Sequence, residues 1–248
     1  MHEKIEEEKK QTLIDHLIEL RGCLIKSFIG WVIGAIVSYL FAEHIINFLL
    51  SPLYKVISPK SKVFFRVFPE VFVVYIKLSI IVGFIISSPY IFYQVWLFVA
   101  PGLYPYEKKW IRSVIFLTCF SFLVGDLLAY YIFLPAILKF LYSFGEKFLV
   151  CKPFLNEYIS FVLKIFIIFG VLFQIPSFLF LLSKLDLVTS EQLRNFRPYA
   201  IILSFFISAI LTSGFDPLNQ ILLAIPLTLL YEVGILLVRS GEFKKKGG

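Results

Sequence analysis

The sequence is short of the residues that build disulfide frameworks, metal centres and water-exposed surfaces. Its 248 residues include three cysteines and three histidines, and only 17% of them are charged. Three cysteines cannot form a disulfide framework. The histidines are spread over distant segments, so we expect no metal site and no cofactor.

Motifs of catalysis are also missing. The chain has no His-Glu-x-x-His pair, no Gly-x-Ser-x-Gly elbow and no glycine-rich phosphate loop. An enzyme acting within a membrane would need a nucleophile beside a base at membrane depth, and the apolar runs show none. We therefore expect no catalytic residue and no enzyme activity.

Apolar residues dominate what is present. They make up 59% of the chain, with 29 Phe and 13 Tyr, and the mean hydropathy is +0.86. A soluble domain is apolar over nearer half of its residues. The apolar runs are continuous and long enough for transmembrane helices, whereas an outer-membrane barrel alternates apolar and polar residues over about ten positions. The pattern predicts an all-α polytopic membrane protein.

The runs predict six transmembrane helices in one integral-membrane domain over residues 1–240. The predicted spans cover residues 24–42, 71–97, 111–134, 158–183, 198–213 and 217–238. Pro135 is expected to end the third span. Residues 241–248 are expected to be a polar tail, of the type that is appended to a protein for recombinant expression.

The helices are predicted to form a curved, concave wall. Pro89, Pro176 and Pro226 lie inside spans and should bend them. The last two spans are short, and the fifth would be about 24 Å long at about 1.5 Å per residue. A hydrocarbon core is about 30 Å thick, so the bilayer would have to thin beside this helix.

The basic residues predict that both termini are cytoplasmic. In that orientation the cytoplasmic segments hold 14 Lys and Arg, against 7 in the opposite loops. Cytoplasmic loops carry the excess of positive charge in membrane proteins. The net charge of +7 is therefore explained without a nucleic-acid partner.

Polar residues within the spans are hypotheses of function by default. Asp126 lies at a depth similar to that of Lys77 and Lys164, which predicts a structural ion pair, most directly with Lys164. Gln174 has two open interpretations, an interhelical hydrogen bond or a docking point for a partner helix. Glu232 is expected either to extend to the headgroups or to pair with Arg239.

Two acids on the predicted cytoplasmic face look ordinary by charge pattern alone. Residues 15–21 predict a short amphipathic helix that lies on the membrane and carries Glu19. Glu107 stands beside Lys108 and Lys109 in a loop. Taken alone, each is a solvated charge.

Several long motifs resemble those of the TatC family, and the similarity extends over nearly the whole chain in the same order. The motifs are His-Leu-Ile-Glu-Leu-Arg at residues 16–21, the block 88–104 followed by Glu107, Phe-Gly-Val at 169–171 with Pro176, Leu-Arg at 193–194 with Arg-Pro-Tyr at 197–199, Leu-Thr at 211–212, Gln220, Leu-Leu-Ala-Ile-Pro at 222–226 and Tyr-Glu-Val-Gly at 231–234.

The resemblance implies a core component of the twin-arginine translocase, which exports folded proteins across the bacterial inner membrane using the proton-motive force. TatC proteins bind Arg-Arg signal peptides and form multimeric complexes with the single-span subunits TatA and TatB. By position, Glu19 and Glu107 match two family acids implicated in arginine recognition, and Phe98 matches an aromatic of the same patch. Leu20, Arg21 and Leu103 complete the expected signal-peptide site.

Some positions depart from the family pattern. Many members have a Glu where this chain has Gln174, which favours a hydrogen-bonding role there. Asp216 corresponds to the family's Asp in a variant of the usual proline-rich turn, and Asp126 lies outside the pattern. The rival interpretation, a small-solute secondary transporter, would predict repeated halves, and the sequence shows no such repeat.

Overall fold

The structure, a computed structural model, describes residues 2–57, 63–99, 111–145, 152–185, 187–211 and 217–246. Within these ranges the elements are helical, apart from one isolated bridge between Phe64 and Phe154. The elements are α1 (His2–Leu40), α2 (Ala42–Val56), α3 (Pro69–Val99), α4 (Ile111–Leu128), the π-helical turn η3 (Ala129–Phe133), α5 (Leu134–Gly145), α6 (Leu155–Leu172), α7 (Ile175–Lys184), α8 (Ser190–Asn195), α9 (Arg197–Leu211) and α10 (Pro217–Lys246).

The all-helical membrane architecture is confirmed. Five stretches within the described residues are long and apolar enough to cross a membrane: His16–Leu40, Pro69–Val99, Arg112–Ser143, Leu155–Lys184 and Leu223–Glu242. The apolar part of α9, Arg197–Ala209, is shorter. A sixth span at α9 therefore stays a prediction.

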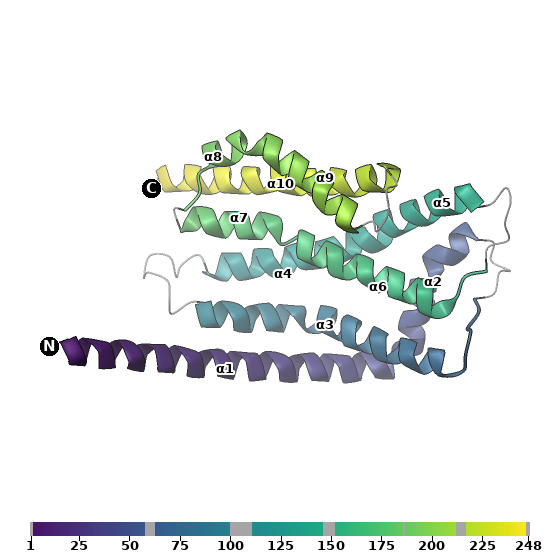
Figure 1. Ribbon diagram of the computed structural model, residues 1–248, viewed down its shortest axis with the longest axis horizontal. Helices are drawn as coiled ribbons and strands as arrows, with labels where there is room; N and C mark the ends of the chain where they lie inside the picture. The colour runs from purple at the N-terminus through teal and green to yellow at the C-terminus, as the bar shows by residue number, and fades with distance from the viewer. Residues whose placement is uncertain are drawn as a thin grey trace.

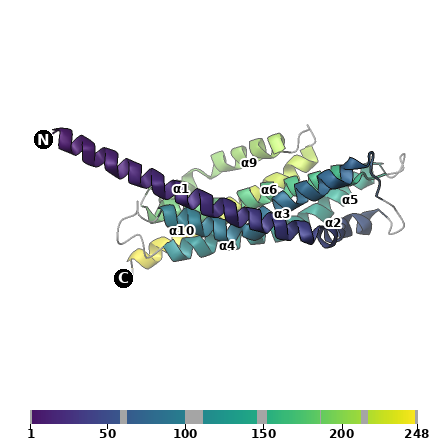
Figure 2. The ribbon, with the colours of Figure 1, turned by 90° about the horizontal axis from the view of Figure 1, so that it is seen from below.

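The long helices lie side by side along the longest axis of the molecule (Figure 1). In order across the view they are α1, α3, α4, α7 and α10, and both chain termini lie at the same end, here called the terminal end. Helices α2 and α5 lie at the opposite end, here called the far end. The second view shows α9 standing apart from α1, α3 and α4 (Figure 2).

Three sequence boundaries differ from the prediction. The predicted membrane-surface helix at residues 15–21 is instead continuous with α1, because nothing in residues 15–24 interrupts the helix. Pro135 does not end the third span: the turn before it widens to a π-helix, in which the Leu134 N–H bonds to the Ala129 carbonyl, and α5 continues. Helix α10 runs through residues 241 and 242 as far as Lys246.

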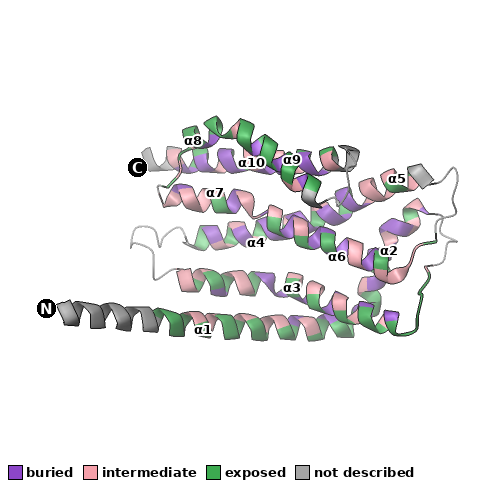
Figure 3. Ribbon diagram, in the orientation of Figure 1, coloured by how far each residue is buried: buried purple, intermediate pink, exposed green. Residues whose placement is uncertain are grey.

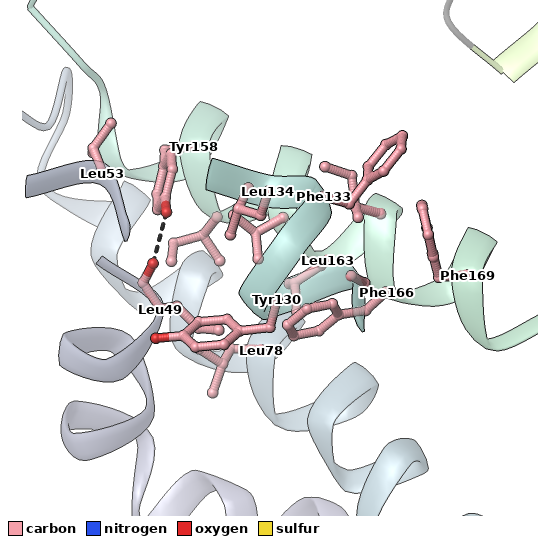
Figure 4. Packing of buried hydrophobic residues seen from close by; sticks show 14 of the residues in the cluster. Leu49, Leu53, Leu78, Tyr130, Phe133, Leu134, Tyr158, Leu163, Phe166 and Phe169 are labelled. Atoms are coloured by element: carbon pink, nitrogen blue, oxygen red, sulfur yellow. Dashed lines mark hydrogen bonds between the residues drawn. The ribbon is translucent and has the colours of Figure 1, made fainter. Parts of the chain in front are cut away.

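The main hydrophobic core occupies the far half of the molecule. It joins α2, α3, η3, α5 and α6 and extends to α10 through Leu223, Leu227 and Leu230. Figure 3 colours the buried residues of these helices. Leu78, Leu134 and Leu163 have 1% or less of their surface exposed. Figure 4 shows these side chains gathered between the helices. A second, smaller cluster of Leu193, Ile235 and Val238 joins α8 to α10.

A proline in α2 deprives one carbonyl of its helical donor, and a tyrosine of the core replaces that donor. Pro52 has no N–H to donate to the carbonyl of Phe48, four residues earlier. The Tyr130 hydroxyl donates to that carbonyl at 2.8 Å, and the Tyr158 hydroxyl donates to the next one, Leu49, at 2.6 Å (Figure 4 for the second). These bonds attach α2 to η3 and α6.

Helices α1 and α3 approach closely where both lack side chains. A Cβ atom on Gly83 would lie 2.5 Å from the Ala35 backbone, and one on Gly34 would lie 2.6 Å from the Gly83 carbonyl oxygen. The Trp31 indole donates to the Ile80 carbonyl at 2.8 Å across the same interface. Lipid removes the hydrophobic drive for helix association, so close backbone packing of this kind has to hold the two helices together.

Replacing Gly83 by Val should separate α1 from α3. The added side chain would meet backbone rather than a movable side chain, and such overpacking costs about 1–3 kcal/mol or more. We expect G83V to unfold at a clearly lower temperature than the parent protein in detergent. The matched control is Gly22→Ala, since Gly22 has no atom within 4 Å of the added Cβ. Equal melting temperatures for G83V and G22A would contradict the close packing.

Candidate functional site

The predicted signal-peptide residues of α1 and α3 meet at the terminal end. The His16 ring stacks on the Phe98 ring with 4.4 Å between centroids and 23° between planes. One helical turn along α1, the Glu19 carboxylate lies 3.9 Å from Nδ1 of His16. The structure therefore brings Glu19 and Phe98 into one patch, and His16 connects them.

His16 was not assigned to the site from the sequence. Its spacing of three residues from Glu19 places both side chains on one face of α1, which was a usable signal. Its contact with Phe98 depends on how α1 packs against α3, and no local pattern shows that packing. We include His16 as a positioning residue of the patch.

The Glu19 carboxylate is open to a ligand. Its side chain is 55% exposed, and His16, at 49%, is the basic side chain that the described structure places beside it. Beside Glu19 on α1, Leu20 is partly buried and Arg21 is exposed, and Phe98 at the end of α3 is partly buried. One carboxylate beside an aromatic ring is suited to binding a cation rather than to catalysis.

Three predicted site residues fall outside the described residues. Glu107 and Leu103 belong to the segment 100–110 between α3 and α4, and Asp216 belongs to the segment 212–216 between α9 and α10. Across the ranges that are described, no three His, Cys, Asp or Glu side chains gather as metal ligands would.

Gln174 lies at the break between α6 and α7. Its side-chain Nε2 is 3.4 Å from the Thr118 carbonyl oxygen of α4 and 3.3 Å from the Gly170 carbonyl oxygen. The Ser177 hydroxyl donates to the Ser121 hydroxyl at 3.2 Å a turn further on. These contacts favour the interhelical interpretation of Gln174.

The predicted ion pair between Asp126 and Lys164 is not formed. Both carboxyl oxygens of Asp126 are buried and have no hydrogen-bond partner among the described residues. The Lys164 side chain is exposed, and Lys77 instead donates to Asn156 at 2.9 Å. Similar depth suggested the pair, but the rotation of each helix about its axis decides which side chains face one another.

Glu232 has a partner that the sequence did not indicate. Its carboxylate lies 2.6 Å from Nη2 of Arg197, which joins the start of α9 to α10. The two side chains are 41% and 38% exposed. The sequence suggested the headgroups or Arg239 as partners of Glu232, and Arg197 was not considered. The short α8 turns the chain back toward α10, and this turn brings Arg197 to Glu232.

The chain is similar to known translocase proteins. The family described as Sec-independent protein translocase protein (TatC) matches residues 15–226. A TatC protein of Magnetococcus marinus is 39% identical over 238 residues, which are 96% of this chain and 88% of that protein. One from Aquifex aeolicus is 41% identical over 94% of this chain and 97% of its own length.

A solved structure agrees with these relatives. The crystal structure of a twin arginine translocase receptor, TatC, matches with a TM-score of 0.76 and 41% identity, over 90% of this chain and 98% of that one. A second crystal structure of a TatC receptor, in DDM, gives a TM-score of 0.78 at the same identity and coverage.

A double-mutant cycle on Asp126 and Lys164 should show no coupling. Asp126→Asn and Lys164→Met are made singly and together, and unfolding free energies are measured in detergent. Residues without contact add within about 0.3–0.5 kcal/mol, whereas partners in an ion pair couple by about 0.5–3 kcal/mol. A coupling energy above about 1 kcal/mol would show that the pair forms after all.

Proposed function

Because the chain belongs to the TatC family of Sec-independent protein translocase proteins, we propose that it is the signal-peptide receptor and core subunit of a twin-arginine translocase. The observation that carries the proposal is the patch of Glu19, His16 and Phe98 at the terminal end. The rival function, small-solute transport, finds no support in the relatives.

The chemistry of the patch fits a pair of arginines. A guanidinium presents a planar fork of N–H donors that a carboxylate accepts through both oxygens, whereas lysine offers a single point charge. Glu19 would hold one arginine, and Glu107, in the neighbouring connection after α3, would hold the other. The Phe98 ring provides a face on which a guanidinium can stack.

Selectivity requires that the site be partly shielded from water. A fully exposed ion pair contributes only about 0–1 kcal/mol. Phe98 and Leu20 are partly buried beside the exposed Glu19, and Leu103 and nearby lipid acyl chains would add apolar cover once a peptide is bound. His16 keeps the Phe98 ring in place through their stacked contact.

The proposed topology places the terminal end in the cytoplasm of a bacterium, with six spans through the inner membrane. Both termini lie at that end, and the excess of Lys and Arg follows the same orientation (Figure 1). In this arrangement α9 is the fifth span. Its 15 residues reach about 22 Å, so the bilayer would thin next to it, which eases passage of a protein.

Assembly with the single-span subunits TatA and TatB would use the apolar faces of the outer helices. Large side chains on α1 and α9 are exposed, among them Phe28, Ile33, Ile202 and Phe206. In a membrane such faces contact lipid or a partner helix. Asp216, at the turn before α10, is the polar group proposed to serve a partner helix.

Removing either recognition acid should weaken signal-peptide binding. A hydrogen bond to a charged group contributes about 1.5–3 kcal/mol, so Glu19→Ala and Glu107→Ala should each raise the dissociation constant roughly ten-fold or more. Affinity is measured with purified protein in detergent and a synthetic Arg-Arg signal peptide.

The control is Glu191→Ala, which removes an exposed acid of α8 at the same end. Its affinity should match that of the parent protein. Unchanged affinity in both E19A and E107A would refute the proposed roles. An equal loss of affinity in E191A would show that any negative charge at this end has the same effect, so that Glu19 and Glu107 have no specific role.

A further inference from the structure

Aromatic side chains project from the far end of the molecule, just before α3. The exposed fractions are 43% for Phe64, 51% for Phe65, 57% for Val67 and 89% for Phe68. Apolar side chains this close together and this exposed mark a site of contact with a protein or a membrane. We call residues 64–68 the aromatic segment.

Hydrogen bonds hold the backbone of the aromatic segment at both ends. The Phe64 N–H donates to the Pro153 carbonyl at 3.0 Å, and the Leu155 N–H donates to the Phe64 carbonyl at 2.8 Å. The Glu70 N–H donates to the Val67 carbonyl at 3.0 Å. The phenyl rings are therefore presented outward by an attached backbone, since the segment is tied to α3 and to the start of α6.

The Glu70 side chain adds two further hydrogen bonds to this attachment. One carboxylate oxygen accepts the Arg66 N–H at 2.6 Å, and the other accepts the Asn156 N–H at 3.1 Å, in the first turn of α6. First-turn N–H groups have no partner within their own helix. A single buried carboxylate thus fixes the segment and completes the end of α6.

The positive charge of the segment is paired with an acid of α6. The Arg66 guanidinium pairs with Glu157 at 2.5 Å and lies 4.5 Å above the Phe154 ring. Lys152 is exposed, and its ammonium lies 6.0 Å from the centre of the Phe64 ring. Because the Arg66 and Glu157 side chains are 60% and 57% exposed, the outward surface combines the apolar rings with an exposed ion pair and the exposed cation of Lys152.

This surface continues along α3 without interruption. Phe68, Phe72 and Ile76 follow at four-residue spacing, which places them on one face, and they are 89%, 59% and 39% exposed. Phe68 directly precedes Pro69, where the membrane-spanning stretch begins. A span that begins at Pro69 would place the rings near the boundary between hydrocarbon and headgroups, the level at which membrane proteins place aromatic anchors.

We propose that the aromatic segment is an interfacial anchor that inserts Phe65 and Phe68 into the bilayer leaflet at the far end. Lys152 contacts lipid phosphate at the rim, and the anchor sets the depth of α3 and α6 in the membrane. The occupant is phospholipid because the surface is an extension of the lipid-facing side of α3. The proposal is independent of signal-peptide recognition.

The direct test places a spin label at position 68. Cys23, Cys119 and Cys151 are replaced by Ser, Phe68→Cys is labelled, and the protein is reconstituted in phosphatidylcholine–phosphatidylglycerol vesicles. Relaxation by oxygen, which concentrates in lipid, is compared with relaxation by a water-soluble nickel chelate. Labels at Phe206 of α9 and at Glu191 of α8 provide the lipid-facing and water-facing references.

We expect oxygen to relax the label at position 68 more than nickel does, as at position 206. Nickel access equal to that at position 191 would overturn the anchor. Shielding from both reagents would overturn it too, because a protein surface would then cover the segment.

A second measurement avoids the apolar character of the label itself. With the label at Val73, in the second turn of α3, the double change Phe65→Ser and Phe68→Ser should raise nickel access at least two-fold. The matched change of two exposed rings at the terminal end, Phe196→Ser and Tyr199→Ser, should leave it unaltered. No difference between the two double variants would contradict the anchor.

Discussion

The close contact of α1 with α3 is the interaction on which the proposed site depends. Only 11% of the most apolar stretch of α1 is buried within the molecule. Few contacts other than those with α3 therefore hold this helix in position. Gly34 and Gly83 let the two backbones approach, and Trp31 adds a hydrogen bond across the interface. His16, with Glu19 beside it, reaches Phe98 because this packing sets the spacing of the two helices at the terminal end.

The two ends of the molecule have different physical characters. At the far end, Tyr130 and Tyr158 bond to the carbonyls of α2, and Glu70 binds two separate backbones. At the terminal end, Glu19 and His16 are about half exposed. The firmly packed half supports the helices, and the open half leaves an acid available to a ligand.

The sequence was sufficient for the features that depend on composition and on local pattern. Long apolar runs predicted the membrane helices, and helix-breaking Pro176 correctly marked the change of direction between α6 and α7. Pro135 was expected to end the helix, but the turn before it widens to a π-helix, and the helix continues although Pro135 has no N–H to donate. Such compensation depends on the backbone and leaves no signal in the sequence.

Features that depend on packing between distant segments were harder to predict from the sequence. Equal depth suggested that Asp126 meets Lys164, whereas Asp126 is buried without a partner among the described residues and Lys164 is exposed. Arg197 was not recognised as the partner of Glu232, since the turn of the chain at α8 sets that contact. Resemblance to a family, rather than spacing, brought Glu19 and Phe98 together as candidates, and His16 emerged only from their three-dimensional arrangement.

The most direct test of the account compares two peptides on the unaltered protein. Purified protein in detergent is titrated with a synthetic signal peptide carrying Arg-Arg and with its Lys-Lys twin, at the same ionic strength. Because a carboxylate accepts the planar guanidinium through both oxygens, the account predicts that the Arg-Arg peptide binds at least roughly ten-fold more tightly. Equal affinities for the two peptides would contradict recognition by the acids of this patch.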